Sequence, residues 1–172
     1  RLDKETSGVL LVAKTDQAKE AALALFLERR IQKIYWALVD GKLQEKKGVI
    51  DNHLGKKREY QGQTLYGEVK NGGSRAITHF SCEKRNKEAS LVFCDLKTGR
   101  THQIRVHFAQ KGHPLLGDSQ YAEGSFRCSY RPHRHLLHAS KLSFIHPFTK
   151  RKIEVEIPLP ADFKAAIQAI FS

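Results

Sequence analysis

The sequence lacks the features that would place it in a membrane, disulfide-rich or secreted class of protein. No apolar run approaches the roughly 20 residues needed to cross a bilayer. The three cysteines, Cys82, Cys94 and Cys128, are an odd number without close spacing, which argues against a disulfide framework and favours the cytoplasm. The chain contains no methionine, and it begins without a start residue or a signal-peptide pattern, so we expect it to be N-terminally incomplete.

Acidic residues are scarce relative to basic ones. The 18 Asp and Glu residues are outnumbered by 30 Lys and Arg residues, which gives a formal net charge of +12. Such an excess predicts a polyanionic partner, with nucleic acid as the first candidate. The alternative is that the basic charge only keeps the protein soluble. The length of 172 residues, with 40% hydrophobic residues, predicts one globular domain over residues 1–172.

Hydrophobic periodicity predicts more strands than helices. The apolar run Val9–Ala13 is typical of a buried strand, and Thr15 is a candidate cap for a helix over residues 16–30. Alternation predicts a strand over residues 34–39, in which Tyr35 and Trp36 face opposite ways. Further strands are expected at residues 76–81, 90–96, 135–145 and 153–157, and a helix in the last segment. The polar, glycine-rich stretch 42–73 is interpreted as excursions between strands. This pattern favours an α+β fold, with a mixed, largely antiparallel sheet flanked by helices.

A second helix is expected over residues 101–111, with Thr101 as its cap and Gly112 and Pro114 at its end. Helical geometry places Arg105 in the middle of the apolar face of this helix. A buried guanidinium is costly without an anionic partner. We predict that this partner is Asp3. Two other acids, Asp95 and Asp118, are the alternatives.

Two segments carry a resemblance to a known family. They are Arg1–Gly8 (RLDKETSG) and Gly99–His107 (GRTHQIRVH), and together they resemble the signature of the RluA-like family of RNA pseudouridine synthases. Residues 33–41, 112–118 and 136–139 also resemble segments of that family. The resemblance implies the pseudouridine synthase catalytic-domain fold. It also implies an isomerase that detaches a uracil base in RNA, turns it and reattaches it through carbon.

The resemblance also implies roles for individual residues. Asp3 would be the attacking carboxylate and Arg105 its ion-pair partner, which keeps the acid deprotonated in a desolvated pocket. Tyr35 would stack on the uracil and is a candidate for removing the C5 proton. Arg1 would enter the RNA where the extruded nucleotide has left. The remaining expected RNA or substrate contacts are Arg100, His102 and the apolar side chain of Leu137.

The implied enzyme needs no cofactor and no metal, and we expect it to act as a monomer. Large-subunit ribosomal RNA is the favoured substrate and transfer RNA the second. Three alternatives remain. A metal site at Cys128, His133, His135 and His138 is disfavoured, because the last two are expected to lie on opposite faces of one strand. A non-catalytic RNA-binding module would bind RNA without turnover. A nuclease or phosphoryl-transfer enzyme is weakest, because the sequence shows neither clustered carboxylates nor a glycine-rich phosphate loop.

Overall fold

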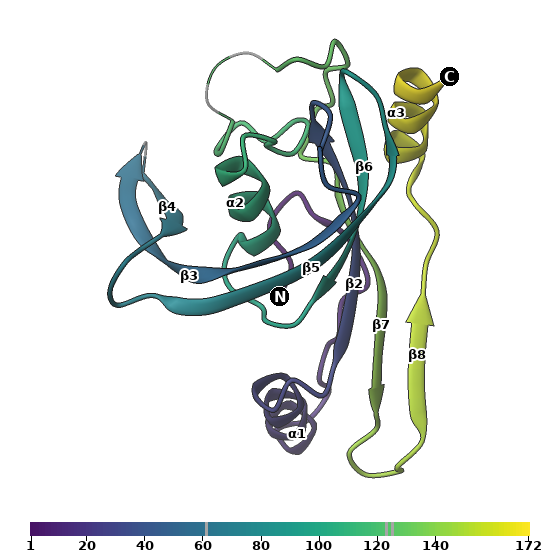
Figure 1. The fold of residues 1–172 in the computed structure, drawn as a ribbon. Coiled ribbons are helices and arrows are strands. Elements are labelled where there is room, and N and C mark those ends of the chain that lie inside the picture. The colour runs from purple at the N-terminus through teal and green to yellow at the C-terminus, as the bar shows by residue number, and fades with distance from the viewer. Residues whose placement is uncertain (61, 123, 125) are drawn as a thin grey trace.

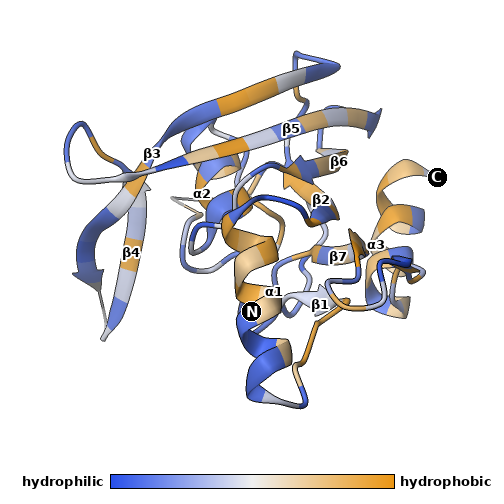
Figure 2. Cartoon of the chain, turned by 90° about the horizontal axis from the view of Figure 1, so that it is seen from below, coloured by the Kyte–Doolittle hydropathy of each residue, from blue (hydrophilic) through white to orange (hydrophobic). Residues whose placement is uncertain are grey.

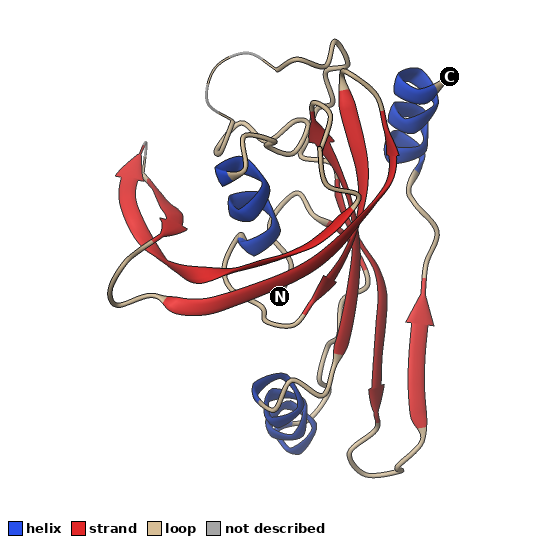
Figure 3. Ribbon diagram, in the orientation of Figure 1, coloured by secondary structure: helices blue, strands red, loops and turns tan. Residues whose placement is uncertain are grey.

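The computed structural model describes residues 1–60, 62–122, 124 and 126–172. Within that part of the chain, strands and helices occupy the following ranges: β1 Ser7–Gly8, α1 Asp16–Leu27, β2 Gln32–Asp40, β3 Lys47–Tyr60, β4 Gln63–Glu68, β5 Ser74–Arg85, β6 Ala89–Leu96, α2 Gln103–Gln110, β7 Leu137–Ile145, β8 Lys152–Glu156 and α3 Ala161–Phe171. Strands form the body of the molecule, and the helices lie around them (Figure 3).

The strands form one curved sheet in the order β1-β7-β2-β6-β5-β3-β4 (Figure 1). Strand β8 pairs with the C-terminal half of β7. The short β1 runs parallel to β7, whereas the other pairs are antiparallel. This arrangement confirms the expected α+β fold with a mixed, largely antiparallel sheet. None of the helices in the described ranges is long and apolar enough to span a membrane.

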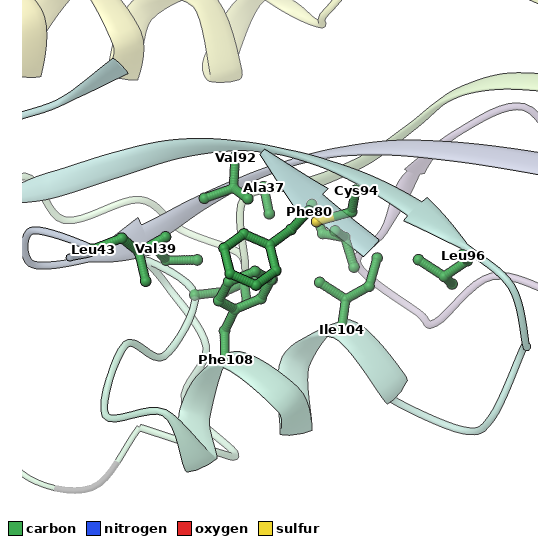
Figure 4. Packing of buried hydrophobic residues seen from close by; sticks show 11 residues of the cluster. Ala37, Val39, Leu43, Phe80, Val92, Cys94, Leu96, Ile104 and Phe108 are labelled. Carbon is green, nitrogen blue, oxygen red and sulfur yellow. The ribbon is translucent and has the colours of Figure 1, made fainter. Parts of the chain in front are cut away.

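Alternate residues of β2 point into two separate cores. Ala37 and Val39 face α2, where Ile104 and Phe108 pack against the sheet (Figure 4). Leu38 belongs to the core on the opposite face, which α3 covers with Phe163. Tyr35 packs on the α2 side and Trp36 on the α3 side, so their predicted opposite orientation is confirmed.

Helix α1 begins as the sequence predicted and ends earlier. Thr15 is the N-cap residue, and its hydroxyl oxygen accepts a hydrogen bond from the Ala18 N–H at 3.1 Å. The helix ends at Leu27 rather than at residue 30, because Arg29 adopts a left-handed conformation with φ of 57°. The chain then turns directly into β2.

The predicted strand over residues 9–13 is wrong. In this part of the chain, pairing with β7 is confined to the two residues of β1 immediately before this run, and residues 9–13 belong to no strand. Leu10 and Val12 are 56% and 72% exposed. Figure 2 shows apolar residues along this segment and on α1. An apolar run becomes a buried strand only beside a partner that covers it, and the described residues supply none here.

The interpretation of residues 42–73 as excursions is also wrong, because most of this stretch forms β3 and β4. The two strands pair with each other, and β3 also pairs with β5 along its first half. Their polar residues are compatible with strands because this end of the sheet has an exposed face and an edge, where charged side chains are favoured. Periodicity was weak here since few side chains are buried.

Candidate active site

The loop that carries Asp3 is fixed to the edge of β7. The Thr6 N–H donates to the Asp3 carbonyl oxygen at 3.0 Å, which closes a turn around the carboxylate. The Thr6 hydroxyl lies 2.8 Å from His135 Nε2. Gly8, with φ of 133°, passes so close to Ala139 that a Cβ atom would lie 2.3 Å from its carbonyl oxygen. A glycine is therefore required where the Asp3 loop joins the sheet.

Arg105 of α2 is buried between two carboxylates. Its Nε and Nη2 atoms donate to Asp118 at 2.7 and 2.9 Å, which makes a buried bidentate pair. Its remaining Nη1 lies 3.5 Å from Asp3 Oδ2. The prediction that Asp3 is the partner was therefore incomplete, because the alternative, Asp118, holds the guanidinium most directly. Arg105 nevertheless connects the two acids.

The charge of Arg105 is stabilised by these neighbours. Burial opposes the charged guanidinium, but the hydrogen bonds and charge of Asp118, together with Asp3, raise the Arg105 pKa above its ordinary value. Burial alone would raise the Asp118 pKa, but Arg105 and two backbone N–H groups lower it. Asp118 and Arg105 are thus both charged near neutral pH, and Asp3 faces a permanent cation.

His102 lies on the other side of Asp3. The expected Thr101 cap is wrong: α2 begins at Gln103, and His102 occupies the N-cap position with φ of 56° and no capping hydrogen bond. Its Nε2 is 4.0 Å from Asp3 Oδ1, and its Nδ1 is 2.7 Å from the Tyr121 hydroxyl oxygen. Burial and the nearby Arg105 lower the His102 pKa, so the imidazole is neutral near pH 7. A non-glycine residue in this left-handed conformation is strained, and such strain is common at functional sites.

Tyr35 faces the same space from β2. It lies opposite Cys94 of β6 and Ala139 of β7 in the pairing register. Burial, with a smaller effect of the Asp3 charge, raises the pKa of Tyr35 to about 12. Its hydroxyl group is therefore protonated near neutral pH.

These side chains line a cavity of about 590 Å³ between α1, the Asp3 loop and the start of α2. We call this cavity the cleft. Its lining includes six of the seven residues predicted for the site, namely Arg1, Asp3, Tyr35, Arg100, His102 and Leu137. The seventh, Arg105, lies behind Asp3 and reaches it through Nη1. Residues far apart in the sequence are thus brought together as the resemblance implied.

The charges around the cleft are mostly positive. Arg1, Lys19, Lys33 and Arg100 line it, whereas Asp3 is the only acid among the described lining residues. Arg1 donates from Nη2 to the Thr101 hydroxyl at 3.0 Å, and Arg100 donates from Nε to the Arg75 carbonyl at 3.1 Å. Leu137 of β7 is buried and contributes an apolar part of the wall. The cleft therefore combines an apolar interior with cationic side chains.

Sequence reasoning missed three contributors to this site. Tyr121, which contacts His102 and Arg105, lies in a loop without periodic pattern, so no signal pointed to it. Lys33 is half-buried, and its Nζ donates to the Thr98 carbonyl at 3.2 Å. Its place on alternate positions of β2 with Tyr35 could have suggested that both face one side. The third contributor is Lys19 of α1, which lines the cleft.

The residues considered for a metal site have other partners. His135 contacts Thr6, and His138 Nδ1 lies 2.9 Å from the Ser7 hydroxyl. His135 precedes β7 rather than lying in it, which corrects the expectation that both histidines share a strand. Cys128 is buried and His133 is exposed. The described residues contain no group of three or more His, Cys, Asp or Glu side chains able to hold a metal ion.

Comparison with known proteins identifies the class to which this fold and cleft belong. Residues 1–110 match the family model described as RNA pseudouridylate synthase. That match spans more than half of the chain, and the protein therefore belongs to the RNA pseudouridylate synthase family. The family resemblance inferred from the sequence is confirmed.

Individual relatives agree with this assignment. The chain is 42% identical to the uncharacterized RNA pseudouridine synthase YhcT of Bacillus subtilis, in an alignment that covers 100% of the chain and 55% of YhcT. It is also 42% identical to the ribosomal large subunit pseudouridine synthase D of Nitrosomonas europaea, covering 99% of the chain and 50% of that protein. The chain thus spans about half the length of the curated relatives it matches.

Solved structures show the same fold. Human RNA Pseudouridylate Synthase Domain Containing 1 superimposes with a TM-score of 0.80 at 30% identity, covering 100% of this chain and 78% of that one. Human RNA Pseudouridylate Synthase Domain Containing 4 gives the same TM-score at 24% identity, covering 99% of this chain and 74% of that one. The second likeness shows the fold alone.

Proposed function

We propose that this protein isomerises uridine to pseudouridine in RNA, with Asp3 as the attacking carboxylate. The observation that carries the proposal is that Asp3 and Tyr35 line one cleft and Arg105 reaches Asp3 from behind it, although the three residues come from separate segments. Membership of the RNA pseudouridylate synthase family supports the same reaction.

The contacts of Arg105 suit this role for Asp3. Two of its nitrogens are occupied by Asp118, and the third faces Asp3 at 3.5 Å, too far for a strong hydrogen bond. The cation therefore faces the carboxylate at a distance that leaves its oxygen atoms free to attack. A carboxylate bound as tightly as Asp118 would be a poor nucleophile.

The cleft also suits an extruded base. A uridine stacked in RNA must leave its neighbours before its base can be detached and turned. The cavity of about 590 Å³ has room for a nucleotide, and Tyr35 and Leu137 supply aromatic and apolar walls for the base. Arg1, Lys33 and Arg100 supply positive charge for the phosphates beside it.

Large-subunit ribosomal RNA is the substrate we favour, because several relatives carry that substrate in their names. Transfer RNA is the second candidate. The isomerisation breaks and remakes a bond between base and sugar without net oxidation, so we propose that neither a metal nor a cofactor takes part. We also propose that the protein acts as a monomer in the cytoplasm, where the three unpaired cysteines would stay reduced.

The test of the proposed function is Asp3→Asn, assayed for pseudouridine formation in ribosomal and transfer RNA. The change keeps the size of the side chain and removes the charge and the attacking oxygen, so turnover should stop while RNA binding persists. Because Arg105 keeps Asp118 as a counter-ion, the change leaves no buried cation unpaired, and we expect the variant to fold. Asp51→Asn is the matched control, since Asp51 pairs with Arg75 outside the cleft and should not be needed for turnover.

A folded Asp3→Asn variant with near-normal turnover would refute the assigned nucleophile. A wild-type protein that binds RNA and never converts uridine would instead favour the non-catalytic RNA-binding module. Mapping pseudouridines in RNA from cells with and without the gene would identify the substrate. Loss of a site in transfer RNA, with ribosomal RNA unchanged, would replace the favoured substrate by the second candidate.

A further inference from the structure

The side chain of His102 is held between two tyrosines. Its ring makes edge contacts with Tyr66 and Tyr121, with centroids 5.7 and 5.5 Å apart. Its Nδ1 is 2.7 Å from the Tyr121 hydroxyl, and that hydroxyl accepts the Tyr66 backbone N–H at 3.1 Å. The imidazole therefore cannot turn without breaking a hydrogen bond and two ring contacts. Its other ring nitrogen, Nε2, lies on the side of Asp3.

The proton between His102 and Tyr121 can lie on either partner. If Nδ1 carries the proton, Nε2 presents a lone pair toward Asp3 Oδ1, 4.0 Å away. The lone pair and the negatively charged carboxylate repel each other. If Tyr121 donates, Nε2 carries the proton and directs an N–H toward the carboxylate, which is attractive. The Tyr121 hydroxyl has a proton to give, because burial raises its pKa to about 12. Electrostatics and proton supply therefore favour the same tautomer.

We propose that Tyr121 is a positioning residue of the cleft, whose hydroxyl fixes His102 in the tautomer that presents an Nε2–H donor beside Asp3. This inference rests on the proposed function, and it assigns to the donor a carbonyl oxygen of the extruded uracil. The 4.0 Å gap between His102 Nε2 and Asp3 Oδ1 is too long for a direct hydrogen bond, so the donor is available to a substrate atom. Its hydrogen bond would hold the base over the carboxylate that attacks.

Tyr121 also touches the rest of the charged network. Its ring lies under the Arg105 guanidinium, with Cζ 4.9 Å from the ring centroid, and its N–H donates to Asp118 Oδ1 at 3.1 Å. Truncation to alanine would disturb all of these contacts at once. Tyr121→Phe keeps the ring and the backbone N–H and removes only the hydroxyl, so it isolates the contact with His102.

The first measurement is the ¹⁵N chemical shift of the His102 ring nitrogens in protein labelled at histidine. The signals of His102 are assigned by their loss in His102→Gln. The wild-type protein should show the Nε2–H tautomer, and Tyr121→Phe should shift toward Nδ1–H or a mixture. A wild-type Nδ1–H tautomer, or an unchanged tautomer in Tyr121→Phe, would overturn the inference. This measurement needs no turnover, so it is decided separately from the proposed function.

The second measurement is the kinetics of pseudouridine formation. We expect Tyr121→Phe to lower kcat by about tenfold, which corresponds to about 1.4 kcal/mol, with little change in KM, because it removes one oriented hydrogen bond. Tyr130→Phe is the matched control, since Tyr130 packs in the α3 core and does not line the cleft. An unchanged kcat in Tyr121→Phe would show that the fixed tautomer plays no part in turnover. Absence of turnover in the wild-type protein would count against the proposed function and leave the tautomer result standing.

Discussion

At the scale of single residues, the protonation of Tyr35 limits what its hydroxyl group can do. With a pKa of about 12, only about one molecule in 10⁵ carries a phenolate at pH 7. In the free protein Tyr35 is therefore a hydrogen-bond donor with a ring that can stack on a base. To remove a proton from carbon, it must first lose its own, and the Asp3 charge opposes that step.

Tyr35→Phe separates stacking from proton transfer. The ring remains, so RNA binding should change little. If the hydroxyl acts in proton transfer, turnover should fall by roughly 100-fold or more, the usual contribution of a positioned acid or base. Pseudouridine formation under single-turnover conditions measures the step directly, with Tyr130→Phe as the control. Full activity of Tyr35→Phe would leave the ring as the only contribution of this residue.

The residue pattern predicted most of the charged site but not the main partner of Arg105. Asp3, Arg105 and Tyr35 were predictable because short motifs place them and helix geometry turns Arg105 inward. The choice between Asp3 and Asp118 as the partner was not. A helical position indicates which side is buried but does not indicate which acid a loop 13 residues later will bring to it. Gly117, with φ of 80° and a Cβ position only 2.1 Å from the Arg134 carbonyl, fixes that loop.

At the scale of elements, prediction succeeded where one face is buried. Strands β2, β5, β6 and β7 and helices α1 and α3 were expected near their observed places, because each buries part of its surface and a buried face favours alternation or a helical stripe. Strand β8 was also expected, from its alternation of apolar and charged residues, although most of its side chains are exposed. Prediction failed for β3 and β4, which fully bury few of their side chains. It also failed for residues 9–13, where the apolar pattern is present and no neighbouring strand is described.

A buried histidine adds polar contacts to the packing of helix α2 against the sheet. His107 is fully buried; its Nδ1 lies 2.9 Å from the Thr78 hydroxyl of β5 and its Nε2 lies 3.1 Å from Asn52 Oδ1 of β3. In the neutral imidazole, Nε2 donates to the Asn52 amide oxygen and Nδ1 accepts from the Thr78 hydroxyl, so both contacts are made without a buried charge. Burial lowers the His107 pKa to about 4, against a small opposing effect of Asp51.

The buried His107 should make the free energy of unfolding fall at acid pH. The folded-state pKa of His107 lies below its ordinary value of about 6.5, so the unfolded chain takes up the proton first. The contribution of His107 is therefore complete above pH 6.5 and is lost as the pH falls toward 4, by up to about 3 kcal/mol. Urea unfolding at pH 7, 5 and 4 measures it. His107→Gln should lose less stability over this interval than the wild-type protein. His133 is exposed, so His133→Gln should lose as much stability as the wild-type protein. Equal acid dependence of wild-type and His107→Gln would contradict the assignment.

At the scale of the whole molecule, the net charge of +12 indicates a polyanionic partner but not where that partner binds. The positions of the basic side chains indicate the binding site. Four basic side chains line the cleft beside one acid among the described residues. A phosphate backbone entering the cleft would displace counter-ions and gain affinity from that asymmetry. The cleft is therefore expected to contribute more to RNA binding than its share of the surface.

The prediction at this scale is a log-linear fall of RNA affinity with salt, with a slope that depends on the cleft. If Arg100 contacts a phosphate, Arg100→Gln should reduce the magnitude of the slope by about one, because one fewer counter-ion is released. The control is Lys87→Gln, which removes the same charge from the exposed turn between β5 and β6. This turn lies beside α3, where Asn86 donates to the Ile170 carbonyl, so the variant should leave the slope unchanged. Fluorescence anisotropy with a short RNA between about 50 and 200 mM salt measures both. Equal slopes for the two variants would place the RNA outside the cleft, and a flat response of the wild-type protein would remove the argument from charge.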